Sequence, residues 1–237
     1  MKKKLKTYWI KSPYPGNFGD ILTPIILNFY NFEVIPSSLK NSEYLFVGSV
    51  ARKANSRHTV LGSGIIRENE SGDPNANWIW ARGPRTRNSV IFHGGSCPEI
   101  FGDPALLLPR IVNPSRKKIK VGIIPHFVDY KIASEKYPNF HIIDILDKDP
   151  TRVIKDITSC QYIISSSLHG IITAHAYGIP AAWVKFSNKL KGDDSKFYDH
   201  FEAMNLKAEI SSVENPIYTS VNYDDYDIHN ILVQKEF

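Results

Sequence analysis

The sequence predicts an α/β protein of two Rossmann-like halves, with a ligand cleft where the halves meet. Three observations support this fold class. Short apolar segments alternate with helical ones, several apolar segments end in glycine, and a polar, turn-rich stretch at residues 113–118 divides the 237-residue chain. Apolar runs that end in glycine are typical of parallel strands, which are buried on both faces. A chain of this length can form one large domain or two small ones.

The first half is expected to contain five short strands and a helix. Leu5–Ile10 is the first expected strand, and a loop rich in proline and glycine follows it. Ile21–Tyr30 is an apolar stretch with Pro24 in its first turn, where proline costs no hydrogen bond, so we expect a helix there. The remaining strands are expected at Tyr44–Val50, His58–Leu61, Trp78–Ala81 and Val90–Phe92.

The second half alternates strands and helices more regularly. Asp149 and Pro150 predict the start of a helix that ends near Cys160, because Asp is a favoured N-cap and Pro suits the first helical position. Strands are expected at Ile119–Ile124, Phe140–Ile145, Tyr162–Ser165 and Ala181–Lys185, and further helices at Leu168–Tyr177 and Phe197–Met204. This β-α-β pattern predicts a parallel sheet with helices on both faces.

These elements suggest domain boundaries. We place an N-terminal domain at residues 1–115, a C-terminal domain at 116–214, and a tail at 215–237 in which we expect a helix that packs back on the first domain.

Composition narrows the ligands and the location. The net charge of +5 favours acidic ligands such as phosphates and carboxylates, and no nucleic-acid-binding motif is present, so we expect no nucleic acid partner. No apolar run reaches the about 20 residues of a membrane-spanning helix, and the location is expected to be cytoplasmic. We interpret the lysine-rich residues 1–6 as a solubilising tail. The alternative is a peripheral contact with anionic lipid at the inner face of the membrane, worth about 1 kcal/mol per basic residue.

The most informative segment connects an expected strand to an expected helix. It carries Ser165, Ser166, Ser167, His169 and Gly170. A helix N-terminus offers free N–H groups and partial positive charge, and serine hydroxyls add donors, so the segment is suited to an anion. An imidazole in the first turn has the right pKa for proton transfer near neutral pH. The alternative is a serine N-cap with a packed histidine.

A second histidine lies on the same expected helix. His175 follows His169 by six residues, a spacing that puts the two side chains on different faces. We therefore expect His175 to be a core or interface residue. No other group of residues has metal-ligand spacing, so no metal is expected, and the two cysteines suggest neither a disulfide framework nor a zinc site.

Further candidates lie at the ends of the expected strands. Arg82 follows one strand directly, and its guanidinium could grip a phosphate or a carboxylate, the alternative being a solvated helix start. Asp20 precedes the first helix and is either its N-cap or a cleft residue that binds sugar hydroxyls or acts as a base. Asp103 either faces the cleft or caps a turn, and His126 ends another strand.

In their order along the chain, these segments resemble the polysaccharide pyruvyl transferase family. The matching segments are Asn17–Asp20, Val60–Gly64, Ala81–Pro84, Gly102–Leu108, Val121–His126, Ser165–Pro180 and Lys196–Phe201, and the pattern covers roughly residues 8–204. The resemblance implies a two-domain fold like that of the GT-B glycosyltransferases. It also implies transfer of pyruvate from phosphoenolpyruvate onto two hydroxyls of one sugar, as a cyclic ketal. The acceptor would be a polysaccharide repeat unit or its lipid-linked oligosaccharide precursor.

The resemblance also suggests roles for residues. We expect His169 to transfer the proton, Arg82 to clamp the donor and Asp20 to act on the acceptor side, with phosphoenolpyruvate as co-substrate and no cofactor. The expected donor-binding residues are Arg82, Ser165, Ser166, Ser167, Gly170, His126, Lys185 and Lys191, and the expected acceptor-binding residues are Asn17, Gly19, Gly62, Ser63, Gly64 and Asp103.

One departure from the family pattern affects donor binding. Many members carry Arg two residues before the histidine, where this chain has Ser167, so another cation must substitute, and Arg82, Lys185 and Lys191 are the candidates. Two other functions stay open. One is a glycosyltransferase that uses a nucleotide sugar, which would need an acidic residue for the donor ribose. The other is a non-catalytic sugar-binding subunit of a polysaccharide assembly complex.

Overall fold

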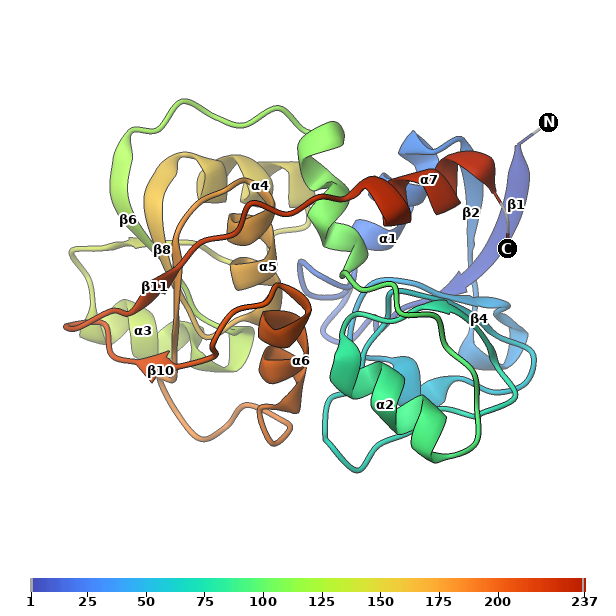
Figure 1. The fold of residues 1–237 in the computed structure, drawn as a ribbon. Coiled ribbons are helices and arrows are strands. Elements are labelled where there is room, and N and C mark those ends of the chain that lie inside the picture. Colours follow the sequence, from blue (N-terminus) through green and yellow to red (C-terminus); the bar gives the residue numbers. More distant parts are fainter. Residues whose placement is uncertain (1, 236) are drawn as a thin grey trace.

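The chain forms two parallel β-sheets flanked by helices in a computed structural model that describes residues 2–235 and 237 (Figure 1). The first sheet consists of β1 (Lys3–Tyr8), β2 (Phe32–Pro36), β3 (Tyr44–Leu45), β4 (Thr59–Leu61) and β5 (Asn77–Trp80). Its strands are ordered β2-β1-β3-β4-β5, and every pair is parallel. The prediction of an α/β fold with parallel sheets is confirmed.

The second sheet repeats this arrangement. It consists of β6 (Ile119–Ile124), β7 (His141–Ile142), β8 (Cys160–Ser165), β9 (Ala181–Val184) and β10 (Ile210–Ser211), together with β11 (Tyr218–Thr219). The order is β10-β9-β8-β6-β7, all parallel, and β11 adds to β9 in the antiparallel direction. The two sheets are compatible with two Rossmann-like halves.

Helices connect and cover the strands. The α-helices are α1 (Leu22–Phe29), α2 (Pro84–Phe92), α3 (Tyr130–Lys136), α4 (Pro150–Thr158), α5 (Leu168–Ala176), α6 (Ser195–Ala203) and α7 (Tyr226–Gln234). Two 3-10 helices matter for the site, η3 (Pro104–Arg110) and η4 (Phe127–Asp129). As predicted, Asp149 caps α4 by accepting a hydrogen bond from the Thr151 amide at 2.9 Å, and Pro150 occupies the first helical position.

Both sheets share a strand order that determines where a ligand can bind. In each sheet the first strand along the chain lies between the second and the third, so the chain turns away to opposite sides after β1 and β3, and after β6 and β8. Open parallel sheets bind ligands at the carboxyl ends of the strands that flank this point. The fold therefore predicts a site formed by the four loops that follow these strands.

The 3-10 helix η3 links the two halves. Its residues Ala105–Leu108 are buried in a hydrophobic cluster that also contains side chains of both sheets. The helix packs against α1 of the first half and α5 of the second. Tyr177 at the end of α5 donates to the carbonyl oxygens of Leu108 and Val112, at 3.1 and 2.6 Å. One continuous core therefore holds the carboxyl ends of both sheets against each other.

The end of the chain lies beside the first half, where α7 runs close to β1 and β2 (Figure 1). Ile228 and Leu232 are fully buried, and the Tyr30 hydroxyl lies 2.8 Å from Nδ1 of His229. Arg110 forms a two-pronged ion pair with Asp225.

Several sequence expectations need correction. Val90–Phe92 is not a strand but the last turn of α2, since Gly83 and Pro84 start a helix and Thr86 and Val90 bury one of its faces. Three apolar residues alone cannot distinguish these structures. Strand β2 was not expected. Residues 3–6 of the lysine-rich start do not form a tail, because they belong to β1, and Met1 lies outside the described residues.

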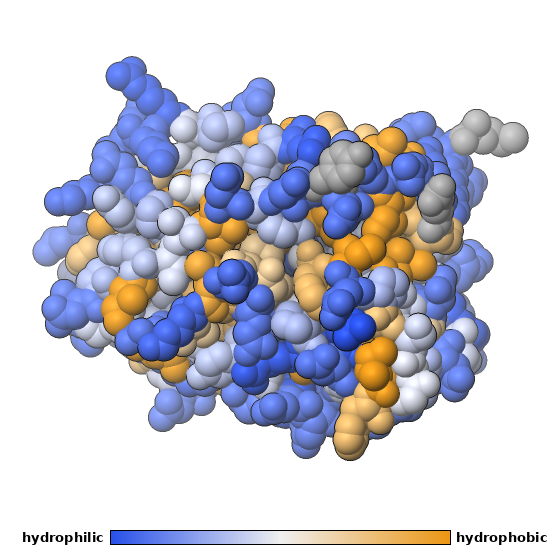
Figure 2. All heavy atoms as spheres, viewed as in Figure 1, coloured by the Kyte–Doolittle hydropathy of each residue, from blue (hydrophilic) through white to orange (hydrophobic). Residues whose placement is uncertain are grey.

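The surface of the described chain is mixed. Figure 2 shows hydrophilic residues over most of one face, with smaller hydrophobic patches between them. The lysines of β1 are partly neutralised, since Lys4 pairs with Glu33 and Lys6 with Glu43. Within residues 2–235 and 237, no helix has the length and apolar character needed to cross a membrane.

Candidate functional site

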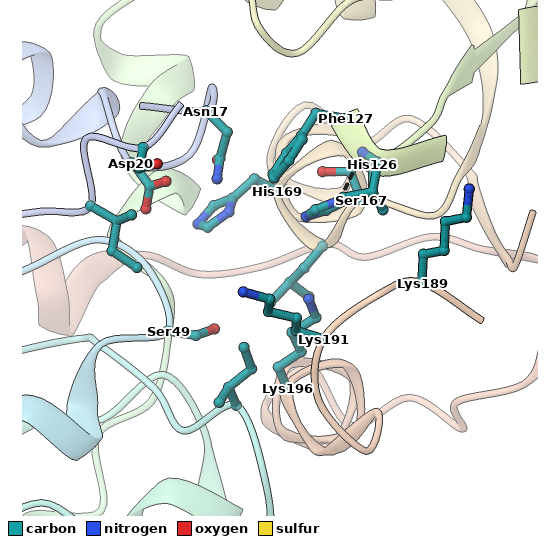
Figure 3. A pocket seen from close by; sticks show the side chains of 15 residues that line it. Asn17, Asp20, Ser49, His126, Phe127, Ser167, His169, Lys189, Lys191 and Lys196 are labelled. Carbon is teal, nitrogen blue, oxygen red and sulfur yellow. Dashed lines mark hydrogen bonds between the residues drawn. The ribbon is translucent and has the colours of Figure 1, made fainter. Parts of the chain in front are cut away.

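A cavity of about 240 Å³ lies at the carboxyl ends of the two sheets, where the four loops that the strand order singles out meet the segments that follow β4 and β9 (Figure 3). Both halves contribute to it. Its polar lining consists of Ser12, Asn17, Asp20 and Ser49 from the first half, and His126, Ser167, His169, Lys189, Lys191 and Lys196 from the second. The volume lies below the about 300–1,000 Å³ typical of drug-sized ligands, so the cavity suits a small ligand.

His169 occupies the middle of the site. It lies in the first turn of α5, and Figure 3 shows its imidazole between Asn17 and Asp20 on one side and Lys191 and Lys196 on the other. The ring packs against the backbone of Gly19, where an added Cβ would lie 2.0 Å from Nδ1. Only glycine therefore fits at position 19. Nε2 has no hydrogen-bond partner among the described residues.

Asp20 is a buried carboxyl group without a full set of partners. Its side chain is 5% exposed, and Oδ2 makes no hydrogen bond within the described chain. Burial raises its pKa to about 6, although the positive charges of His169 and Lys196 act in the opposite direction. Asp20 does not cap α1, whose N-cap is Ile21 without a side-chain hydrogen bond. The capping interpretation was therefore wrong. A carboxyl group that titrates near pH 6 can act as a base.

Three lysines give the cavity its positive charge. Lys189 and Lys191 are exposed, whereas Lys196 is 7% exposed, at the start of α6. Burial and the nearby charge of Arg82 lower the pKa of Lys196 to about 8. Within residues 2–235 and 237, none of these ammonium groups forms an ion pair with a carboxylate, unlike Lys185, which pairs with Asp194. The three lysines are thus available to an anion.

His126 is held in a neutral form by its surroundings. Burial, followed by the charges of Lys196 and His169, lowers its pKa to about 3. Its amide donates to the Ser166 hydroxyl at 2.9 Å, and Ser166 donates to Asp129 at 3.2 Å. An uncharged imidazole can donate or accept a hydrogen bond but adds no charge to the cavity.

Of the serine-rich turn, Ser167 reaches the cavity. The Ser165 hydroxyl bonds to the carbonyl oxygens of Ile124 and Ser167, at 2.8 and 2.9 Å, and Gly170 is buried. Ser165 and Gly170 thus shape the turn. The N-cap Ser167 makes no side-chain capping bond, which leaves the α5 N-terminus to attract an anion.

Arg82 lies outside the cavity lining. Its side chain is fully buried, and its guanidinium donates to Asp199 at 3.0 Å, to the Ser49 hydroxyl at 2.8 Å and to the Ile65 carbonyl at 2.6 Å. Asp199 also accepts from the amide and hydroxyl of Thr86, at 2.9 and 2.7 Å. This network joins α2 to α6. Arg82 therefore does not lie at a solvated helix start, which was the alternative interpretation. A direct contact between its guanidinium and the expected phosphoenolpyruvate donor would require breaking the ion pair with Asp199.

The glycine-rich segment after β4 also serves packing. Gly62, Ser63 and Gly64 do not line the cavity. Ser63 donates to the Gly48 carbonyl at 2.8 Å and accepts from the Val50 amide at 3.2 Å. A Cβ at Gly64 would lie 2.2 Å from the guanidinium carbon of Arg82, so glycine is needed there to seat that side chain.

Sequence reasoning missed four polar residues of the cavity. They are Ser12, Ser49, Lys189 and Lys196. A clue to Lys196 existed, because a lysine in the first turn of a helix opposes the helix dipole and is a poor choice for stability. Ser12 and Ser49 offered no such clue, since serine is common in any turn.

The described chain offers no obvious metal centre. Among residues 2–235 and 237, no three His, Cys, Asp or Glu side chains come together in a way that could hold a metal ion.

Comparison with known proteins identifies the family of this chain. The family of polysaccharide pyruvyl transferases matches residues 3–188. The chain belongs to this family. A curated protein of Acanthamoeba polyphaga mimivirus, described only as uncharacterized, is 32% identical to this family member over 182 residues. The match covers 71% of this chain and 62% of that protein, so the chain spans less than two thirds of that relative's length.

The cavity lysines bear on the one departure of this pyruvyl transferase family member from the family pattern, which is Ser167 at the position where many members carry arginine. Among the substitutes considered for an arginine at position 167, Arg82 and Lys185 are engaged with carboxylates, whereas Lys191 lines the cavity. Lys189 and Lys196 accompany it. The positive charge near Ser167 thus comes from the segment that leads into α6.

Proposed function

We propose that this protein transfers pyruvate from phosphoenolpyruvate to a sugar of a surface polysaccharide or its lipid-linked precursor, forming a cyclic ketal. The observation that carries the proposal is the composition of the cavity. Three lysines that pair with no carboxylate among the described residues lie on one side with a helix N-terminus, a buried carboxyl lies on the other side, and an imidazole lies between them. We also propose that the two halves form a GT-B-like arrangement around this cavity.

The second half would bind the donor. Phosphoenolpyruvate carries a phosphate and a carboxylate on neighbouring atoms, and each needs positive charge and N–H donors. Lys196 is the buried cation and Lys191 and Lys189 the exposed ones, so Lys196 is expected to contribute most, because water screens its charge least. The α5 amides and Ser167 would hydrogen-bond the same anion.

The reaction moves protons between named groups. The protonated imidazole of His169 would give a proton to the methylene carbon of the donor, which leaves an oxocarbenium-like carbon. A sugar hydroxyl attacks that carbon and releases its proton to Asp20 or back to His169. The carbon–oxygen bond to phosphate then breaks, and the second hydroxyl closes the ring. Its proton leaves with the phosphate, so all protons are accounted for.

The first half would present the acceptor. Asp20 and Asn17 lie on the side of the cavity opposite the lysines (Figure 3), where a carboxylate and an amide suit sugar hydroxyls. Asp20 is the one carboxyl group among the described lining residues. The described lining residues of the second half thus include no acidic side chain that could hold the ribose of a nucleotide-sugar donor, which favours phosphoenolpyruvate over the glycosyltransferase alternative.

One assay tests the function. The chain is incubated with phosphoenolpyruvate or with nucleotide sugars, together with a panel of oligosaccharides and lipid-linked oligosaccharides, and released phosphate or nucleotide is measured. We expect release of phosphate that depends on both phosphoenolpyruvate and acceptor. His169→Ala should lower turnover by about 10²–10⁴-fold and leave the circular dichroism spectrum unchanged.

A matched surface variant controls for nonspecific effects. Lys131→Ala removes an exposed lysine of α3 that pairs with Glu135, and it should turn over like the wild type. Nucleotide release in place of phosphate release would support the glycosyltransferase. Binding of saccharide without turnover of any donor would support a sugar-binding subunit.

A further inference from the structure

A buried carboxylate outside the cavity lining faces the central histidine. Asp103 is fully buried, and its Oδ1 accepts the Ala105 amide at 2.9 Å as the N-cap of η3. Its Oδ2 lies 3.6 Å from Nε2 of His169. Neither of these two atoms has a hydrogen-bond partner among the described residues. Leaving a buried charged oxygen unpaired is costly, so the pair calls for an explanation.

The other nearby hydroxyl does not supply the missing partner. Tyr223 lies close to Gly102, and burial raises its pKa, so the phenol stays protonated. That proton is used elsewhere, because Tyr223 donates to the Phe101 carbonyl at 2.8 Å. The imidazole of His169 is therefore the group positioned to donate to Asp103.

We propose that Asp103 is the positioning residue of His169, accepting a hydrogen bond from Nε2–H and leaving Nδ1 to exchange the proton with the substrate. A separation of 3.6 Å is longer than a hydrogen bond, so the ring must move closer to Asp103 for the bond to form. Such bonds are often long in structures without substrate. The bond formed by one ring nitrogen decides which tautomer the imidazole adopts. This role rests on the proposed function and differs from the acceptor contact expected from the sequence.

The geometry on the opposite edge of the ring supports the assignment. Nδ1 faces Gly19, next to Asn17 and Asp20, which both line the cavity. The proton that Nδ1 gives to the donor's methylene carbon is replaced by the proton that the attacking hydroxyl releases, either directly or by way of Asp20. The imidazole thus ends in its starting protonation state, and Nε2–H keeps donating its hydrogen bond to Asp103 throughout the reaction.

The contact also joins the two halves. Asp103 begins η3 of the first half, and His169 begins α5 of the second, and these two helices pack against each other. A carboxylate held by a buried helix cap can orient a side chain more precisely than one on a mobile loop. The imidazole of one sheet is therefore oriented by a residue of the other.

Asp103→Asn tests the proposal, and the chain offers a matched control. Asp149 is also an N-cap followed by proline and accepts an amide at 2.9 Å, but it is exposed and pairs with no histidine among the described residues. Asn can cap a helix as Asp does, so both Asp→Asn variants should unfold near the wild-type temperature. In Asp103→Asn, the new side-chain amide would donate to Nε2 of His169 and move the ring proton to Nδ1.

Two measurements on the whole chain are compared. Nitrogen-15 NMR of labelled histidines, without substrate, should show the Nε2–H tautomer of His169 in wild type and Asp149→Asn, and the Nδ1–H tautomer in Asp103→Asn. Phosphate release from phosphoenolpyruvate should fall about 10²–10⁴-fold in kcat for Asp103→Asn alone, with KM nearly unchanged.

The outcomes separate this inference from the proposed function. A tautomer shift in a protein that transfers pyruvate to no acceptor would retain the pairing and reject the proposed function. A wild-type tautomer in Asp103→Asn would overturn the pairing, whether or not turnover falls, since a loss without the shift would reflect packing alone.

Discussion

Two strand-to-helix turns, one in each half, differ in what happens to their polar groups. After β5, the side chains of Arg82 and Thr86 donate hydrogen bonds to the carboxylate of Asp199. After β8, His169 Nε2 makes no hydrogen bond among the described residues, and Ser167 leaves the N-terminus of α5 without a side-chain cap beside the cavity. Polar groups that satisfy each other stabilise the fold, whereas polar groups left open on a rigid frame can bind a ligand.

The comparison also explains why the arginine-rich segment after β5, which is the stronger sequence motif, does not line the cavity. Three arginines after a strand are an obvious anion-binding pattern, and a single lysine before an aromatic residue is not. Yet Arg82 is fully buried on Asp199, and Lys196 faces the cavity. The position of the partner carboxylate, 117 residues away in the sequence, decides between the two roles.

The largest effect should come from breaking the Arg82–Asp199 ion pair at the turn after β5. Arg82→Ala leaves Asp199 as an unpaired buried charge, which should cost about 3–5 kcal/mol of unfolding free energy, measured by urea denaturation. Arg85→Ala is the control, because it removes the half-exposed pair with Glu202 between the same two helices and should cost under about 1 kcal/mol. If Arg82→Ala kept its stability and lost only affinity for phosphoenolpyruvate, Arg82 would be the donor clamp.

The turn after β8, which carries His169, should lose activity when a single methyl group is added beside the imidazole. Gly19→Ala places a Cβ on Nδ1 of His169 and must displace the ring, so we expect kcat to fall about 10²-fold. Melting temperature should change much less, since the ring borders a cavity. Gly94→Ala is a control away from the site: its φ of +85° strains any added Cβ although nothing lies near it, so it should lower the melting temperature and leave kcat unchanged. Normal turnover of Gly19→Ala would show that His169 works in another orientation.

Turnover should follow a bell-shaped pH profile. Asp20, with a pKa of about 6, accepts a proton only when ionised, so kcat/KM should rise as pH increases through 6. Lys196, with a pKa of about 8, loses its charge above that pH, so donor binding should weaken there. Lys196→Arg should move the alkaline limb upward, because Arg stays charged. Asp20→Asn should remove the acidic limb along with most activity, and an unchanged limb would assign it to another group.

The smallest effect concerns the exposed cations. Lys191→Ala should raise the KM for phosphoenolpyruvate a few-fold at low salt and less at 0.15 M salt, where charges are screened over about 8 Å. Lys196→Ala should raise it more and with a weaker salt dependence, because its ammonium is buried. Equal effects of the two variants at all salt concentrations would mean that burial does not separate their roles.

Local patterns predicted much of the fold. The Asp149–Pro150 cap, the α5 helix and strand β6 lie close to where composition and periodicity placed them, since each depends on neighbours in sequence. Val90–Phe92 was misassigned, because three apolar residues fit a helix end as well as a strand. The proposed domain boundaries stay predictions.

The site was only partly predictable for a related reason. His175 was correctly expected to be a core or interface residue, and it bonds to His200 at 3.0 Å, with its pKa lowered to about 4 by burial. Ser165, Ser166 and Ser167 look alike in sequence, but only the last lines the cavity, because hydrogen bonds to the chain occupy the other two.

By itself, the sequence determined the α/β class, the family and the turn that carries His169. All three depend on the order of residues along the chain, which the sequence contains directly. Only the tertiary structure decided which polar groups are paired within the protein and which stay available to a ligand. Arg82 meets Asp199, Asp103 faces His169, and Lys196 meets no carboxylate among the described residues. Contacts between distant segments set these outcomes, since burial makes each unpaired charge costly until a partner or a ligand satisfies it.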